Sequence, residues 1–404
     1  MIMVANEKRT TIKYKISLDS LINTISDSLM IVFLIMAIMY YFVNIEYLQI
    51  RLVFLVAAGL MGVLNYVYKH HVSTRIIGYI LTAIVCFFIC ALFDANYSYT
   101  VNKFICTISY MGIALNILSH ARKSKIYELL FYLTTGLVLY NIYVMRIPIS
   151  RIIQDGSSYN YISINILFFY MMASITRIDE GKKISVLQSL VYLVVAISAY
   201  GRAGILSGFI LIFGLVLFST LEKSSKWKLL LFVIIGVSII AISFYWEELL
   251  DFLINHSTIV GKFALRGFSD SSRVELWSEF LTNNKNSLKG LLLGSDLGLV
   301  RIDENLHNSF LQMYSSFGVL FFLINIVLSA ITAKFYFTKN RWKLLLFLIL
   351  VVRAFTDRVF YHGINECIYY YFLFDMMLSQ QNSIKVKKRS NAVILELIGQ
   401  EEAL

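Results

Sequence analysis

The feature that most constrains this chain is a series of uninterrupted apolar stretches of roughly 17–20 residues, which recur from Ser28 to Leu378. Each is long enough to cross about 30 Å of hydrocarbon as an α-helix. The chain is 58% hydrophobic and 15% charged, whereas a soluble domain is about half apolar and about a quarter charged. A β-barrel would instead show alternation over about 10 residues. We therefore expect an all-α polytopic membrane protein.

The Lys and Arg residues between these stretches alternate in a way that sets an orientation. If the N-terminus is cytoplasmic, each loop on that side carries several basic residues, from Lys8–Lys15 at the start to Lys385–Arg389 at the end. Basic residues collect on the cytoplasmic side of membrane proteins, so both termini are predicted to be cytoplasmic. The predicted spans are residues 27–43, 52–67, 76–93, 104–119, 126–145, 160–176, 184–200, 203–219, 227–245, 308–333, 342–360 and 363–380.

This arrangement accounts for most of the net charge of +11. Basic segments beside membrane spans contact the anionic lipid headgroups of the cytoplasmic leaflet. The charge therefore predicts the lipid bilayer as a partner and gives no reason to expect a nucleic acid. The four cysteines lie in or beside apolar stretches, which argues against a disulfide framework. No metal-ligand spacing accompanies them, so we predict neither a metal nor a cofactor.

The span pattern divides the chain into four parts. Residues 1–245 are predicted to form an N-terminal bundle of about nine helices, and residues 246–307 a long extracytoplasmic loop. Residues 308–380 form the C-terminal spans, and residues 381–404 a basic cytoplasmic tail. The polar, basic N-terminus lacks the pattern of a cleavable signal peptide, so we expect the first span to remain as an anchor.

The long loop is expected to be ordered in part. Apolar residues in Ser271–Asn284 repeat at helical spacing, which predicts an amphipathic helix on the outer membrane face or over a cavity. The glycines of Gly290–Gly298 predict a turn region. Long ordered loops are usually functional, so we expect this one to form a lid or part of a site. The alternative is a poorly ordered insertion.

The helix after the loop begins with polar groups that lipid tolerates poorly. Next to His307, the residues Asn308, Gln312 and Ser315 (or Ser316) follow i, i+4, i+7/8 spacing and share one helix face. Polar groups at membrane depth usually face the bundle interior or a water-filled cavity. We predict an outward-opening pocket lined by this face, with His307 at its mouth. The alternative is that His307 only caps the helix at the membrane interface.

Three arginines outside the cytoplasmic loops predict an anion site. Arg202 lies in the tight turn AYGRAG (Ala199–Gly204), where the glycines let other groups approach the backbone closely. Arg266 and Arg273 lie in the long loop. Arginine is always charged and holds phosphate bidentately. We expect these side chains to form a cationic cluster on the outer face if the loop folds back.

Charged residues near the outer end of the eleventh span have a plainer interpretation. Arg353 and Asp357 are four residues apart, so they share a helix face and are expected to form a structural ion pair. The sequence contains no convincing Asp/Glu pair of the kind that glycoside hydrolases use.

Three of these features together resemble the superfamily of O-antigen polymerases and O-antigen ligases, the Wzy-type polysaccharide polymerases and lipid-A-core ligases of bacterial envelopes. They are Arg202 in a GRAG turn, the long loop with SSRVELW, and LHNSFLQMYSSFGVLFFL after it, which looks like the family's H-N-x-x-L-Q…G signature. The resemblance covers about Ala199 to Leu323, and the first half of the chain matches in hydropathy alone. It implies a GT-C-like glycosyltransferase fold of about 12 transmembrane helices.

The resemblance also implies a reaction and its residues. The donor would be a glycan on undecaprenyl pyrophosphate, at the outer face of the bacterial cytoplasmic membrane. The enzyme would be an inverting, metal-independent glycosyltransferase that builds capsule, O-antigen or exopolysaccharide. Arg202 with Arg266 or Arg273 would hold the pyrophosphate, and His307 would be the general base. A chain-length regulator and a flippase of the same pathway are implied as partners.

The residues agree with this chemistry. A pyrophosphate is already a good leaving group, and fixed arginines can neutralise its growing charge without reorganisation. A histidine can accept the proton of the acceptor hydroxyl. The polar face of Asn308, Gln312 and Ser315 would then receive the acceptor sugar.

A purely structural assembly partner would not need arginines on the outer face. Two other functions also fit the sequence less well. One is a ligase of the same superfamily, which transfers finished glycan to another molecule. The other is a flippase or transporter of lipid-linked oligosaccharides. Transporters often consist of two similar halves, but here the long late loop has no counterpart in the first half.

Overall fold

In the computed structural model of the protein, every regular element of the described residues is an α-helix. The structure describes residues 2–42, 48–70, 73–93, 97–152, 160–222, 226, 271–294, 306–360 and 363–381. The helices are α1 (Ile2–Phe42), α2 (Leu48–Lys69), α3 (Thr74–Phe93), α4 (Tyr97–Ser119), α5 (Ser124–Tyr143), α6 (Ile149–Ile152), α7 (Asn160–Asp179), α8 (Val186–Ser198), α9 (Arg202–Leu221), α13 (Ser271–Lys285), α14 (Leu288–Leu293), α15 (Ser309–Lys339) and α16 (Arg341–Thr356). Residues 366–381 form a further helix.

Seven helices of the described part are long and apolar enough to cross a membrane, and each coincides with a predicted span. They are Leu18–Phe42, Ile50–Lys69, Thr74–Phe93, Val101–Ser119, Asn160–Asp179, Arg202–Leu221 and Ser309–Lys339. Helices α5, α8, α16 and 366–381 also coincide with predicted spans but do not reach the same combination of length and hydropathy. The span predicted at 227–245 lies outside the described residues. A helical, multi-pass membrane protein is thus confirmed.

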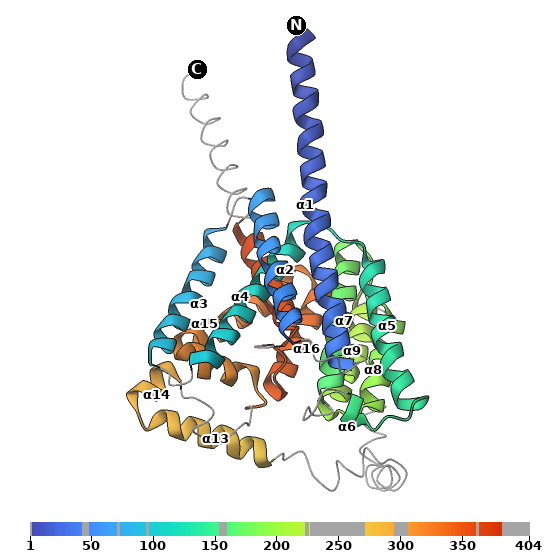
Figure 1. The fold of residues 1–404 in the computed structure, drawn as a ribbon. Coiled ribbons are helices and arrows are strands. Elements are labelled where there is room, and N and C mark those ends of the chain that lie inside the picture. Colours follow the sequence, from blue (N-terminus) through green and yellow to red (C-terminus); the bar gives the residue numbers. More distant parts are fainter. Residues whose placement is uncertain are drawn as a thin grey trace.

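Ion pairs tie the helices together at one end of the bundle. The guanidinium of Arg122, after α4, lies 2.8 Å from a carboxylate oxygen of Asp27 on α1. The ammonium of Lys343, at the start of α16, lies 3.0 Å from both Asp179 on α7 and Asp375 on the last helix. These cations all lie in or beside loops that the charge pattern predicts to be cytoplasmic. The loop helices α13 and α14 lie at the opposite end from the start of α1 (Figure 1).

Helices α2 and α4 approach each other closely because glycines line their contact. A Cβ atom added to Gly62 would lie 2.1 Å from the carbonyl oxygen of Gly112, and one added to Gly112 would lie 2.2 Å from that of Gly59. Lipid supplies no hydrophobic drive between helices, so transmembrane helices associate by close packing at small residues. This contact fixes the position of α4 and of the side chains that it sends toward α15.

Replacing Gly62 with valine is expected to prevent normal folding, because α2 and α4 would have to separate to admit the side chain. The yield of monodisperse protein, measured by size-exclusion chromatography in detergent, should fall severalfold. Gly78→Val is the matched control, since a Cβ at Gly78 has nothing within 4 Å. Equal yields for the two variants would show that this contact does not limit folding.

The helix predicted after the long loop is interrupted. The backbone of α15 leaves helical geometry at Gly318, with φ 77° and ψ 173°, a region that is essentially restricted to glycine. Gly294, at the end of α14, has nearly the same angles. A Cβ on Gly318 would lie 2.8 Å from the carbonyl oxygen of Leu292, so α14 packs directly on the break. The predicted turn region of Gly290–Gly298 therefore begins in helix α14.

Gly318→Ala should destabilise the protein through both backbone strain and this clash. A positive φ costs a residue other than glycine about 1–2 kcal/mol. The contact between the new Cβ and the carbonyl oxygen of Leu292 cannot be relieved by a rotamer change. Gly181→Ala separates the two causes, because Gly181 has φ 73° but nothing near its Cβ position. Thermal unfolding in detergent should show a larger loss for Gly318→Ala than for Gly181→Ala. Equal losses would mean that α14 moves aside freely.

Candidate functional site

Asp357 is the centre of a charged cluster at the end of the bundle that holds α13. This residue ends α16 and is only 2% exposed. Its carboxylate lies 3.2 Å from the guanidinium of Arg353, 3.6 Å from that of Arg273 and 3.9 Å from Nδ1 of His307. The amide of Asn160 also approaches it, at 3.4 Å. Two of the predicted site residues, Arg273 and His307, therefore meet at one carboxylate.

Arg353 connects this carboxylate to α7. It is fully buried, and its Nη2 lies 3.3 Å from the hydroxyl of Ser163 and 3.4 Å from the backbone oxygen of Asn160. The predicted ion pair with Asp357 is confirmed. A buried charge is tolerated when it is paired and hydrogen-bonded, so Arg353 and Asp357 stabilise each other at the start of α7.

Helix α13 packs against the cluster and bonds to the chain on both sides of it. Arg273 donates to the carbonyl oxygen of Thr356 at 2.5 Å, at the end of α16. Trp277 donates from its indole to the carbonyl oxygen of Leu306 at 2.6 Å, directly before His307. Leu306 packs in a small apolar core with Leu276 and Phe280 of α13 and with Tyr314 of α15. The amphipathic helix predicted in the loop thus covers the end of the bundle.

His307 has a strained backbone. Its φ is 47°, a conformation that is uncommon outside glycine, although histidine is among the residues enriched there. Tyr200, directly before the Arg202 turn, has φ 54°. Backbone strain of this kind concentrates at functional sites and persists where surrounding contacts fix it. Here the Trp277 bond and the capped start of α15 fix His307 from both sides.

The turn that carries Arg202 packs against the same part of α7. A Cβ on Gly201 would lie 3.1 Å from the side-chain oxygen of Asn160, and one on Gly204 would lie 2.4 Å from the hydroxyl of Ser163. These are the α7 groups that contact Asp357 and Arg353. The close approach expected from the flanking glycines is therefore present, and it brings Arg202 to the cluster's end of the bundle.

Several helices begin at this end, and three of those that the structure describes start beside the cluster. They are α7 at Asn160, α9 at Arg202 and α15 at Ser309. A helix N-terminus carries a partial positive charge and unpaired N–H groups, which favour anions. The guanidinium groups of Arg273 and Arg353 lie beside these helix starts, where Asp357 pairs with both.

On the polar face of α15, Asn308 and Ser315 bond to the backbone, whereas Gln312 does not. Asn308 is the N-cap, accepting from the N–H groups of Phe310 and Leu311 and donating to the carbonyl oxygen of Phe355. Ser315 donates to the backbone oxygen of Gln312 at 2.8 Å. Gln312 is 1% exposed, and neither atom of its amide has a hydrogen-bond partner among the described residues. Of the three, only Gln312 has an amide whose donors and acceptor are unused by the described residues, so they are available to a ligand or water.

The sequence did not predict that Asp357 is the centre of the cluster, because its spacing from Arg353 already accounted for it as the partner in an ion pair. The available signal was its position at the predicted outer end of a span, the same end as His307. No sequence pattern indicated that Asn160 and Ser163 would contact Asp357 and Arg353. Arg266 lies outside the described residues.

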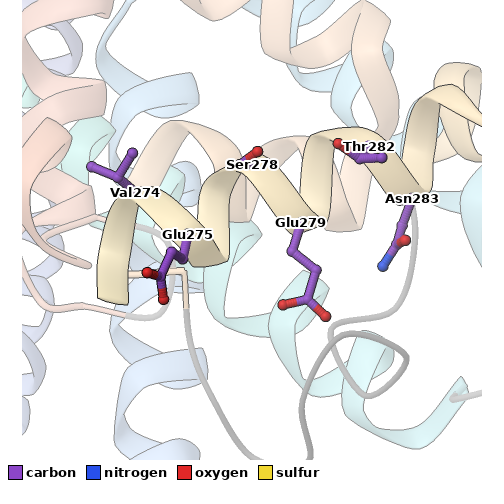
Figure 2. A pocket seen from close by; sticks show the side chains of 6 residues that line it. All are labelled: Val274, Glu275, Ser278, Glu279, Thr282 and Asn283. Atoms are coloured by element: carbon purple, nitrogen blue, oxygen red, sulfur yellow. The ribbon is translucent and has the colours of Figure 1, made fainter. Parts of the chain in front are cut away.

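A separate open groove of about 470 Å³ lies along the other side of α13. Figure 2 shows Glu275, Glu279 and Asn283 projecting to one side of the helix and Val274, Ser278 and Thr282 to the other. By helical period, Val274, Ser278 and Thr282 face away from Leu276 and Phe280, whereas Glu279 and Asn283 border the face that carries those two residues. None of the cluster residues lines this groove, so the two surfaces of α13 are distinct.

Comparison with known proteins does not assign the chain. No family model, curated protein or solved structure matches it.

Proposed function

We propose that this protein is a membrane glycosyltransferase that polymerises undecaprenyl-pyrophosphate-linked oligosaccharide repeat units on the outer face of the bacterial cytoplasmic membrane. The observation that carries the proposal is the approach of His307 and Arg273 to one buried carboxylate, Asp357, under α13. Histidine beside a carboxylate suits proton abstraction, and arginine near helix N-termini suits a phosphate.

The histidine activates the acceptor. Nδ1 of His307 lies on the Asp357 side at 3.9 Å, a distance that a small movement converts to a hydrogen bond. Catalytic hydrogen bonds are often long before substrate binds. An Nδ1–H bond to the carboxylate leaves Nε2 as the base. As the acceptor hydroxyl oxygen bonds to C1 of the donor sugar, its proton passes to Nε2.

The arginines stabilise the leaving group. The bond between C1 and the pyrophosphate oxygen breaks as the new glycosidic bond forms, so the configuration at C1 inverts. Negative charge grows on the departing undecaprenyl pyrophosphate, and Arg202 and Arg273 lie at the end of the bundle where it would be neutralised. Arg353 is fully buried and pairs with Asp357, so its role is to position that carboxylate.

Deleting the gene tests the function. We expect single lipid-linked repeat units to accumulate on the outer face of the membrane, and the ladder of polymeric surface glycan to disappear from gels. Arg273→Ala should reproduce the defect, whereas Arg75→Ala, which removes an arginine that bonds Gln380 at the opposite end, should restore the ladder. Membrane expression is checked for each variant.

Other results of the deletion would replace the proposal. Finished polymer left on its lipid carrier would indicate a ligase of the same superfamily. Repeat units trapped on the cytoplasmic face would indicate a flippase.

A further inference from the structure

A second polar cluster lies within the bundle, beside the first half of α15. Lys103 of α4 is 6% exposed, and its ammonium lies 3.5 Å from the hydroxyl of Ser316, which is 5% exposed. Gln312 lies one turn before Ser316 on the same helix face. The sequence of α4 gave no reason to expect a substrate contact there. We call these three residues the α4–α15 polar cluster.

This cluster contains bonding capacity that the described residues do not use. Both amide atoms of Gln312 are buried without a hydrogen-bond partner in the described part of the chain. One turn along α4 from Lys103, the hydroxyl of Thr107 is also fully buried and has no hydrogen-bond partner among the residues that the structure describes. A buried polar group without a hydrogen bond costs about 1–3 kcal/mol. Such groups call for an explanation, such as a water molecule or a ligand.

The mixture of donors and acceptors indicates the kind of ligand. The ammonium of Lys103 only donates, whereas the amide of Gln312 both donates and accepts. A phosphate or carboxylate could accept from Lys103 and from the NH₂ of Gln312 but could not donate to Oε1. Sugar hydroxyl groups donate and accept, so one sugar ring can satisfy all these groups.

We propose that Lys103, Gln312 and Ser316 bind a sugar residue of the acceptor glycan. The inference rests on the proposed function and names its acceptor subsite. Gln312 lies one helical turn, about 6 Å along the axis, from the cap residue Asn308 that follows His307. A glycan bound here therefore extends from the base into the bundle. The flexible four-carbon stem of Lys103 lets its ammonium move when the sugar arrives.

The test measures binding of the free repeat-unit oligosaccharide, released by mild acid from the lipid carrier that the deletion strain accumulates. Purified full-length protein in detergent is titrated, and binding is followed by microscale thermophoresis. Gln312→Leu and Lys103→Met should each weaken binding about tenfold, the effect of losing one or two hydrogen bonds. Thr332→Val is the matched control, because Thr332 is another fully buried α15 residue whose hydroxyl has no partner in the described structure.

Thermal unfolding separates recognition from structure. Gln312→Leu should unfold at the same temperature as the wild type or higher, because an unpaired buried amide is replaced by an apolar group. A structural role would instead lower the unfolding temperature together with binding, and that result would overturn the proposal. So would equal binding by wild type and Gln312→Leu, which is the outcome if Gln312 bonds only to water. Absence of binding to the wild type would also overturn it.

The same assays keep this inference distinct from the proposed function. His307→Ala should still bind the oligosaccharide while losing polymerisation. If His307→Ala polymerises normally, the proposed reaction site is wrong, whatever Gln312 does. If the deletion strain accumulates repeat units but Gln312→Leu binds them like the wild type, only the acceptor subsite is wrong.

Discussion

Replacing His307 with alanine is expected to slow polymerisation by about a hundredfold to ten-thousandfold, the usual contribution of a general base. The acceptor hydroxyl is a poor nucleophile, and the described residues place no other imidazole within the Asp357 cluster. The measurement is the initial rate of polymer formation by purified enzyme from lipid-linked repeat units. The Michaelis constants for donor and acceptor should change little, because the histidine acts on a proton rather than on binding.

His70→Ala provides the matched control for this prediction. His70 bonds the backbone oxygen of Ser119 at 3.1 Å, at the other end of the bundle, so its loss should leave the rate within about twofold of the wild type. A polymerisation rate for His307→Ala close to that of His70→Ala would leave His307 as only the residue before a helix cap. Normal unfolding temperatures for both variants are required, since His307 also occupies a strained backbone position.

The ends of the spans could be predicted from the sequence because hydropathy and charge are local properties. Runs of apolar residues mark membrane-crossing helices, and alternation of the loops assigns each span end to one side. That reasoning correctly placed His307, Arg273 and Asp357 at a common end. It also predicted the helix of Ser271–Asn284, because its apolar residues repeat at the helical period.

The composition of the site could not be predicted in the same way, because it depends on lateral packing of the helices. Asp357 is separated from His307 by 50 residues and from Arg273 by 84, and no periodic pattern links such distant positions. Asn308 and Gln312 look alike in sequence, yet one caps a helix and the other has an unused amide. The break in α15 at Gly318 could not be predicted either, because a lone glycine inside a helical pattern is commonly tolerated.

The ion pair between Arg353 and Asp357 should dominate the stability of this end of the bundle. Asp357→Asn removes the negative charge but keeps the size of the side chain, and it leaves the fully buried Arg353 without its counter-ion. Removing one member of a buried pair costs about 3–5 kcal/mol. We expect a loss of that size in the free energy of unfolding, measured by denaturant titration in mixed micelles.

The double variant Arg353→Met with Asp357→Asn distinguishes stability from catalysis. Replacing a buried ion pair by well-packed apolar residues is often neutral. The double variant leaves no unpaired charge in the interior, so it should regain most of the lost stability. It should not regain activity, because His307 and Arg273 still lack the carboxylate that they share. Recovery of both properties would mean that Asp357 serves only to neutralise Arg353. Recovery of stability alone would assign to Asp357 a second role, which is to orient the imidazole that takes the proton.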